Sequence, residues 1–268
     1  MQLHNYHNHK VLGNKKVFIH VINQINELNT KGISINVEGE IKQVYFILSH
    51  IVGDNLGLNT ILGFTKSFNP SHCCRICYIS KEEMQSTIIE NSNLLRNGEN
   101  YKKHSVEKSH GIVENCVFHN IINFHVTKNI SVDPMHDLLE GICRYDIAKI
   151  LYDLICKKAF SVEILNESIK NFCHSSFDKN IPYIKLDSII NKMIILSASE
   201  MHYLVLNLGL FIGDLVPTKS SVWKLYVMLR KIVNISMLKS VNNDIVNSFA
   251  MLVSQYLELY LNIFKCSF

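Results

Sequence analysis

Residues 53–77 read GDNLGLNTILGFTKSFNPSHCCRIC, and the interpretation of the whole chain starts from this stretch. It opens with Asp54, which ends an apolar run, and closes with the C-x-x-C pair Cys74 and Cys77. Carboxylate oxygens are ligands that Mg²⁺ prefers, and two thiolates at this spacing can bind one Zn²⁺. The stretch therefore joins a candidate magnesium ligand to a candidate zinc half-site.

A second stretch, residues 124–146 with the sequence FHVTKNISVDPMHDLLEGICRYD, carries the side chains that such a half-site lacks. Structural zinc is four-coordinate, so two cysteines need two further ligands. The stretch offers ligands of the right types in His125, Asp133, His136 and Glu140. We predict a zinc site made of Cys74, Cys77, His136 and His125, with His119 and Cys116 in reserve and Cys73 able to replace Cys74.

The thiol pair also has a simpler interpretation. Eight cysteines in 268 residues place two of them at C-x-x-C spacing by chance fairly often. A buried cysteine behaves as a small hydrophobic side chain without any metal. His136 is equally ambiguous, because a histidine near a helix start is kept neutral by the helix dipole, which suits ligation without requiring it. Spacing alone leaves both interpretations open.

Taken in order, the blocks GDNLG, CRIC, FHVTKN, VDPMHDLLEG and SASEM resemble the catalytic region of DDE-type cut-and-paste transposases. They are most similar to the CACTA/EnSpm group and to transposase domain-containing proteins of animal genomes. The resemblance runs from about residue 53 to about residue 230. It implies an RNase H-like fold, a structural Zn²⁺, catalytic Mg²⁺ and a DNA partner, which in an intact relative is the transposon ends.

The resemblance also implies a catalytic set of acids. Two-metal cleavage and strand transfer need carboxylates that converge from separate elements. By resemblance, Asp54 is the second of three such acids, and Glu200 in LSASEMHYLVLNLG is the third. Asp133 and Glu140 compete for these roles, because the D-x-x-H string that begins at Asp133 recurs in several transposase superfamilies. The assignment among these acids stays open.

Both preferred acids have local alternatives. Asp54 follows Gly53, as a turn-capping aspartate would. Ser197 and Ser199 precede Glu200 in a pattern that is also a plain helix-start signal. Relatives carry the first acid on an earlier strand, whereas the first 39 residues here have only Glu27 and Glu38 as acids. We therefore expect an N-terminally truncated fragment that lacks the first acid and the DNA-binding domain, and that is inactive as it stands.

Composition limits the class of protein. With 47% hydrophobic and 19% charged residues, the chain can bury one sizeable core or two smaller ones. A formal charge of +4 and a pI near 8.5 permit a polyanionic partner but are weak for a dedicated nucleic-acid-binding domain. No signal-peptide pattern opens the chain, and no apolar run is long enough for a membrane span. We expect an intracellular protein, nuclear or cytoplasmic, with no membrane partner and with homo-oligomerisation left open.

The periodicity predicts one buried strand and many helices. Residues 17–28 suit an amphipathic helix, and residues 43–52 (QVYFILSHIV) predict a buried central strand with Asp54 at its end. The chain is predicted to be helical from Asp133 (as N-cap) and Pro134 onward. Further helices are expected over residues 161–172, 197–211, 220–233 and 243–264.

The predicted fold class is α/β, with an incomplete RNase H-like core, a zinc knuckle and a mostly α-helical C-terminal half. Residues 1–80 form the partial α/β segment with the knuckle, residues 81–115 a polar loop or insertion, and residues 116–268 the helical region that completes the core. Two functions from other classes remain as alternatives. One is a zinc-stabilised, non-catalytic DNA- or chromatin-binding module, and the other is an unrelated α-helical protein-interaction domain.

Overall fold

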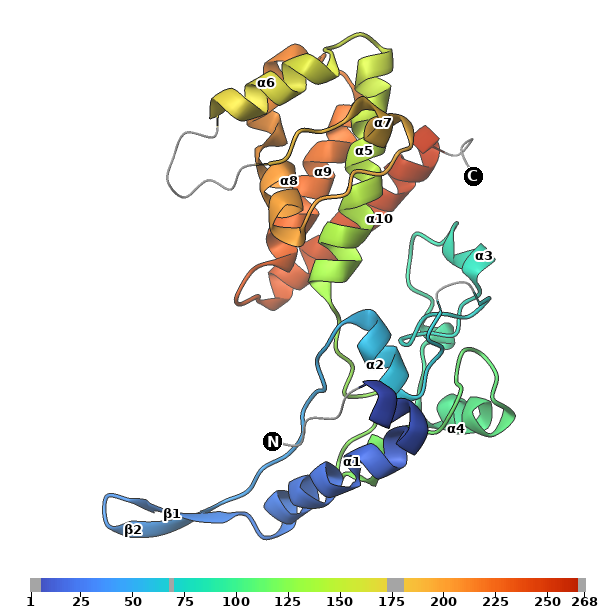
Figure 1. Cartoon of the computed structure of the whole chain (residues 1–268), viewed down its shortest axis with the longest axis vertical. Helices are drawn as coiled ribbons and strands as arrows, with labels where there is room; N and C mark the ends of the chain where they lie inside the picture. Colours follow the sequence, from blue (N-terminus) through green and yellow to red (C-terminus); the bar gives the residue numbers. More distant parts are fainter. Residues whose placement is uncertain (1–5, 68–69, 173–180, 265–268) are drawn as a thin grey trace. The chain divides into compact units, whose positions relative to one another are not determined.

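The computed structural model describes residues 6–67, 70–172 and 181–264, and the chain divides into two compact units. Unit 1 comprises Met1–Asp133 and unit 2 comprises Pro134–Phe268. Each unit has an apolar core of its own. Most of the described residues are helical, and the described strands form a single two-stranded antiparallel sheet (Figure 1). The division after Asp133 differs from the expected segment limits at residues 80 and 115.

Unit 1 combines one long helix with short elements. In chain order these are α1 (Tyr6–Thr30), β1 (Ile33–Val37), β2 (Glu40–Val44), α2 (Asn55–Leu62), α3 (Lys81–Met84), η1 (Ser92–Leu94), α4 (Gly98–Glu107) and η2 (Val117–Asn120). The helix expected over residues 17–28 is confirmed within α1. The core of the unit gathers Ile22 of α1, Leu58 of α2, Tyr101 of α4 and Phe118 of η2. This small core leaves much of the unit to be held by polar contacts.

The sheet is a hairpin on the surface of unit 1. Ile33 pairs with Val44 and Val37 with Glu40, and the turn between them places Glu38 and Gly39 at positive φ (56° and 92°). Two consecutive residues of this kind give a turn whose twist matches that of the strands. All residues of β1 and β2 are exposed except the half-buried Val44, and Figure 1 shows the hairpin projecting from the rest of the unit.

The buried central strand predicted over residues 43–52 is wrong. Strand β2 ends at Val44, and the segment that follows has no strand partner; Ile47 is 70% exposed and Val52 is 80% exposed. Two carbonyls of this segment accept side-chain hydrogen bonds instead of ladder bonds. The Asn129 amide donates to the Ser49 carbonyl at 2.7 Å, and the Ser131 hydroxyl donates to the Ile51 carbonyl at 2.6 Å. A dense apolar run was therefore a misleading sign of burial.

The loop expected over residues 81–115 contains α3, η1 and α4. Helix α4 starts with a capping box, in which the Asn97 side chain accepts from the backbone N–H of Asn100 and the Asn100 side chain accepts from the N–H of Asn97. Reciprocal capping satisfies two N–H groups that a helix start leaves unpaired. Arg96, Tyr101 and His104 are buried, so this polar segment is part of the unit's interior.

Unit 2 is an all-helical bundle in the part that the structure describes. Its elements are η3 (Met135–Ile142), α5 (Cys143–Cys156), α6 (Val162–Phe172), α7 (Leu186–Ile190), α8 (Ala198–Ile212), η4 (Gly213–Leu215), α9 (Ser221–Ser236) and α10 (Asn243–Phe264). The helices predicted over residues 161–172, 197–211, 220–233 and 243–264 are confirmed. Helices α5, α8 and α9 supply most of the buried side chains of its core. None of the described helices combines the length and apolar character needed to cross a bilayer.

The start of unit 2 is a π-helix rather than the α-helix that was predicted. Pro134 occupies the capping position of η3 in place of Asp133, and no side-chain cap is formed there. Gly141 departs from helical geometry, and a Cβ atom on it would lie 2.7 Å from the His136 carbonyl oxygen. Because such a contact is too close for a side chain, glycine is required where η3 passes into α5.

Candidate metal and carboxylate site

The C-x-x-C loop holds its two thiols within hydrogen-bonding reach of each other. The hydrogen bond from Cys77 lowers the pKa of the Cys74 thiol to about 6, and the same bond raises the pKa of Cys77. The Cys74 sulfur also accepts from the backbone N–H of Ile76 at 3.3 Å. A thiolate beside a thiol, both half-buried, suits a metal half-site, because metal ligation requires the deprotonated form.

A buried arginine braces this loop from one side. The Arg96 guanidinium donates to the Cys74 carbonyl at 2.9 Å and to the His110 carbonyl at 2.6 Å. Its backbone N–H also donates to the Ile76 carbonyl at 2.9 Å. Arg96 is 4% exposed, and its positive charge contributes to the lowered pKa of Cys74. The loop is thus fixed by an internal cation that also favours the thiolate.

Three histidines that were not predicted as ligands lie beside the loop. The ring centroids of His72 and His110 are 4.7 Å apart, and those of His104 and His110 are 4.0 Å apart in a stacked arrangement. The Nδ1 atom of His72 lies 2.9 Å from the Tyr78 carbonyl oxygen, which would orient a metal-ligating imidazole. Burial lowers the pKa of both His104 and His110. The available signal was the position of His72 directly before the paired cysteines.

Arg75, between the two thiols in sequence, joins three separate segments of unit 1. Its guanidinium donates to the Asn55 side-chain oxygen at 2.7 Å and to the Ser131 carbonyl at 3.1 Å. Asn55 follows Asp54, and Ser131 lies two positions before Asp133. The loop is therefore connected directly to the segments that carry two of the predicted acids.

The segments of Asp54 and Asp133 also contact each other. The carbonyls of Ser49 and Ile51 accept hydrogen bonds from Asn129 and Ser131, so the two stretches run side by side. Asp54 is the N-cap of α2, and its Oδ1 atom accepts from the backbone N–H of Gly57 at 2.7 Å. The turn-capping alternative for Asp54 is therefore confirmed, at a place where the chain also brings a second carboxylate segment close.

His125 lies in an aromatic stack. Its ring is parallel to that of His119, with centroids 4.1 Å apart, and Tyr101 packs edge-on against both. The Nδ1 atom of His125 lies 2.8 Å from the Thr127 hydroxyl, and His119 Nε2 accepts from the Val126 N–H at 3.2 Å. Burial lowers the pKa of His119 to about 4, so this ring is neutral. These contacts give His119 a structural role.

The remaining predicted ligands belong to unit 2. His136 and Glu140 are half-buried on η3, and Glu200 is near the start of α8. Glu200 completes a capping box, in which its carboxylate accepts from the backbone N–H of Ser197 at 2.8 Å. The predicted zinc and acid sets are thus divided between the two units. Among the described residues, no group of three or more His, Cys, Asp or Glu side chains is arranged to hold a metal ion.

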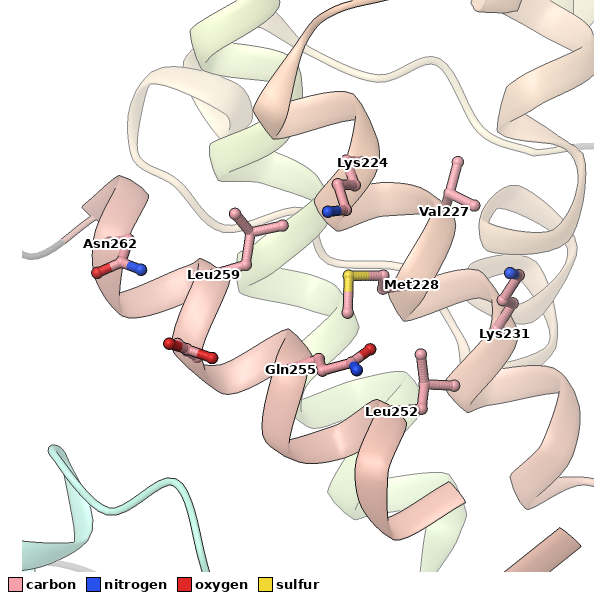
Figure 2. A pocket seen from close by; sticks show the side chains of 9 residues that line it. Lys224, Val227, Met228, Lys231, Leu252, Gln255, Leu259 and Asn262 are labelled. Atoms are coloured by element: carbon pink, nitrogen blue, oxygen red, sulfur yellow. The ribbon is translucent and has the colours of Figure 1, made fainter. Parts of the chain in front are cut away.

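Unit 2 has a candidate binding surface of another kind, a groove of about 480 Å³ between α9 and α10 (Figure 2). Met228 lies between the two helices, with Leu252 and Leu259 of α10 beside it. Two lysines, Lys224 and Lys231, line the groove from α9. Glu258 lines it from α10, so the groove keeps a formal excess of one positive charge beside its apolar side chains, which suits a partner that is both apolar and acidic.

Comparisons with family models, with curated proteins and with solved structures give no match for this chain. Function is therefore inferred from the residues and their contacts.

Proposed function

We propose that the chain derives from a DDE-type transposase similar to the CACTA/EnSpm group, and that it binds divalent metal and DNA. The observation that carries the proposal is the junction made by Arg75, where the GDN segment, the CRIC loop and the chain before Asp133 meet. Two of the sequence blocks on which the resemblance rests, GDNLG and CRIC, are joined there, and Ser131 directly precedes a third, VDPMHDLLEG. A chance likeness between short motifs gives no reason for those motifs to be in contact.

In this proposal each predicted residue has a distinct task. Cys74 and Cys77 begin a structural zinc knuckle, for which unit 1 supplies His125 as a further ligand. Asp54 and Asp133 hold a divalent cation in unit 1, and Glu200 caps α8 in unit 2. Mg²⁺ would supply Lewis-acid stabilisation of the charge that develops on phosphate oxygens during attack by water or a 3′-hydroxyl. Acting on DNA, the protein would work in the nucleus.

The chain alone is proposed to bind DNA without cleaving it. Two-metal chemistry needs several converging carboxylates, and only Asp54 and Asp133 belong to the segments joined by Arg75 in unit 1. This combination leaves the zinc-stabilised, non-catalytic DNA-binding module as the nearest alternative. The Asp54→Asn variant separates the two, because it should lower the affinity for a divalent cation if Asp54 is a ligand, whereas a pure DNA-binding module has no such affinity to lose.

The deciding experiment is the zinc content of the purified protein, by elemental analysis. Wild type should carry about one equivalent, and Cys74→Ser should lose it, because a half-site with one thiol holds zinc poorly. The matched control is Cys156→Ser, since Cys156 is exposed and lies in unit 2. His136→Ala then tests the contribution of unit 2. A folded wild-type protein without zinc would contradict the knuckle.

A second candidate function rests on α10. Only Tyr256 of this 22-residue helix is buried, and the groove beside it has an apolar floor and two lysines. A helical interaction domain would use this surface for an acidic amphipathic helix. Charge reversal at Lys224 and Lys231 should abolish such binding while leaving zinc content and DNA affinity unchanged. If the double variant instead weakens DNA binding, the groove belongs to the DNA surface.

A further inference from the structure

We propose that Arg75 is a positioning residue, through which the spacing of the Cys74 and Cys77 thiols sets the geometry of the Asp54 and Asp133 segments. The metal-binding role of Asp54 and Asp133 rests on the proposed function. The coupling between the thiols and the two segments rests on contacts within unit 1. Arg75 donates to Asn55 at 2.7 Å and to Ser131 at 3.1 Å, from different nitrogen atoms of one rigid guanidinium. A planar fork of this kind fixes the distance and angle between two acceptors, which a single flexible amine does not.

The position of Arg75 in the chain makes the coupling direct. It lies between Cys74 and Cys77, so its backbone moves with anything that draws the thiols together or separates them. The loop is braced elsewhere, because Arg96 holds the Cys74 carbonyl and Ile76 donates to the Cys74 sulfur. A change at the thiols is therefore transmitted through the Arg75 side chain, which donates the hydrogen bonds from this loop to Asn55 and Ser131.

The contacts of Arg75 indicate that it positions the two acid-bearing segments more than it stabilises the fold. Its Nε–H group is buried, with no acceptor among the described residues, and a buried donor left unpaired offsets the gain from the other two bonds. The two acid-bearing segments also stay attached without Arg75, through Asn129 and Ser131. Removing Arg75 should therefore change the local order of these segments more than it changes global stability.

Hydrogen exchange followed by mass spectrometry tests the coupling in the full chain. In Arg75→Gln, amides in residues 49–57 and 129–133 should exchange about tenfold faster, the size expected for one charge-assisted hydrogen bond. Arg75→Lys should give an intermediate effect, because lysine keeps the charge and loses the fork. Arg144→Gln is the matched control, since Arg144 in unit 2 likewise has a buried, unpaired Nε–H. Unchanged exchange in both segments of Arg75→Gln would overturn the proposal.

Two further measurements separate this proposal from the proposed function. Cys74→Ser should accelerate exchange at residues 129–133 while Cys156→Ser does not; no effect of Cys74→Ser would refute the link to the thiols. Mn²⁺ affinity, measured by electron paramagnetic resonance, should fall about tenfold in Arg75→Gln at unchanged zinc content if one lost hydrogen bond misplaces the acids. A wild type that binds no Mn²⁺ would overturn the metal-binding function only, because hydrogen exchange still decides the role of Arg75.

Discussion

Unit 1 and unit 2 are each stabilised by a different kind of interaction. In unit 2, one apolar cluster runs through α5, α8 and α9, and α9 alone buries seven side chains. In unit 1 the core is smaller, and side chains such as Asn26, Arg75 and Arg96 make hydrogen bonds to distant parts of the sequence. Apolar packing tolerates some repacking, whereas hydrogen bonds impose direction and distance. The polar unit is thus the one able to fix ligand geometry.

The largest expected effect tests whether the two cores are independent. Leu204→Ala removes a fully buried side chain of α8 and should lower the free energy of unfolding of unit 2 by about 3 kcal/mol. Leu58→Ala should cost unit 1 a similar amount, because Leu58 is 1% exposed. Denaturant unfolding, with exchange to assign each transition, should show one transition shifted in each variant. A joint shift of both transitions would mean that the units unfold as one.

The next effect depends on pH and concerns a buried acid in unit 2. The Tyr256 hydroxyl donates to Asp146, which is 6% exposed, and burial raises the pKa of Asp146 to about 6. The groups that face this carboxyl are Cys143 and Lys149 on α5 and Tyr256 and Tyr260 on α10. Because the folded-state pKa lies above the unfolded value, this contribution to stability is full below about pH 4 and is lost as the pH rises through 6.

Over that window unit 2 should lose on the order of 2–3 kcal/mol of stability from this group. Denaturant midpoints measured from pH 4 to pH 7 would show the slope, and Asp146→Asn should flatten it. A wild type and an Asp146→Asn variant with parallel pH profiles would show that Asp146 is solvated. Asp146 is the one buried Asp, Glu, Lys, Arg or His side chain in the described part of unit 2, so such a result would leave that part without a buried carboxyl or cationic group.

Removing a helix N-cap should have a smaller effect on stability, of equal size in the two units. Ser197→Ala removes the cap of α8, and Asn97→Ala removes the cap of α4; each should lower the free energy of unfolding of its unit by about 1 kcal/mol. Ser199→Ala is the control for α8, because its hydroxyl makes only a 3.4 Å contact with Ser197. Thermal and denaturant unfolding measure both. A much larger loss for Asn97→Ala would show that polar contacts in unit 1 act cooperatively.

The smallest effect is expected on the hairpin. Ile41 is 78% exposed on β2, so Ile41→Thr should change the free energy of unfolding of unit 1 by less than about 0.5 kcal/mol. Light scattering at increasing concentration would check for an effect on self-association, which should fall as the apolar surface is reduced. A destabilisation comparable to that of Leu58→Ala would reveal that this side chain is covered in solution.

The sequence was sufficient for α6, α8, α9 and α10 because their apolar residues recur at helical spacing, and the caps of α8 and α9 are local. The pairing of Ser197 with Glu200 is visible within four residues, and the structure forms it. The strand predicted over residues 43–52 was wrong because burial is not a local property and depends on what covers a segment. Helix α4 was missed because its polar composition concealed Tyr101 and His104, two interior side chains.

For the candidate site, the types of residue were predictable from the sequence, but which of them contact one another was not. Asp54 and the C-x-x-C pair could be selected from local patterns. The contact of Arg75 with Ser131 spans 56 positions, and no periodicity encodes it. His110 likewise contacts His72 and Arg96, and stacks on His104, only through the fold of the intervening chain.

A single residue in the π-helix η3 sets the helical register at the start of unit 2. A π-turn contains one more residue than the α-turn it replaces, and Gly141 lies where that surplus is resolved. Deleting one residue there would restore a continuous α-helix from Met135 into α5. Each residue in an α-helix advances the side-chain direction by about 100°, so the deletion would rotate His136 and its neighbours around the helix axis relative to α5. Register at this point, rather than residue identity, would then decide which side chains the first turns of unit 2 present.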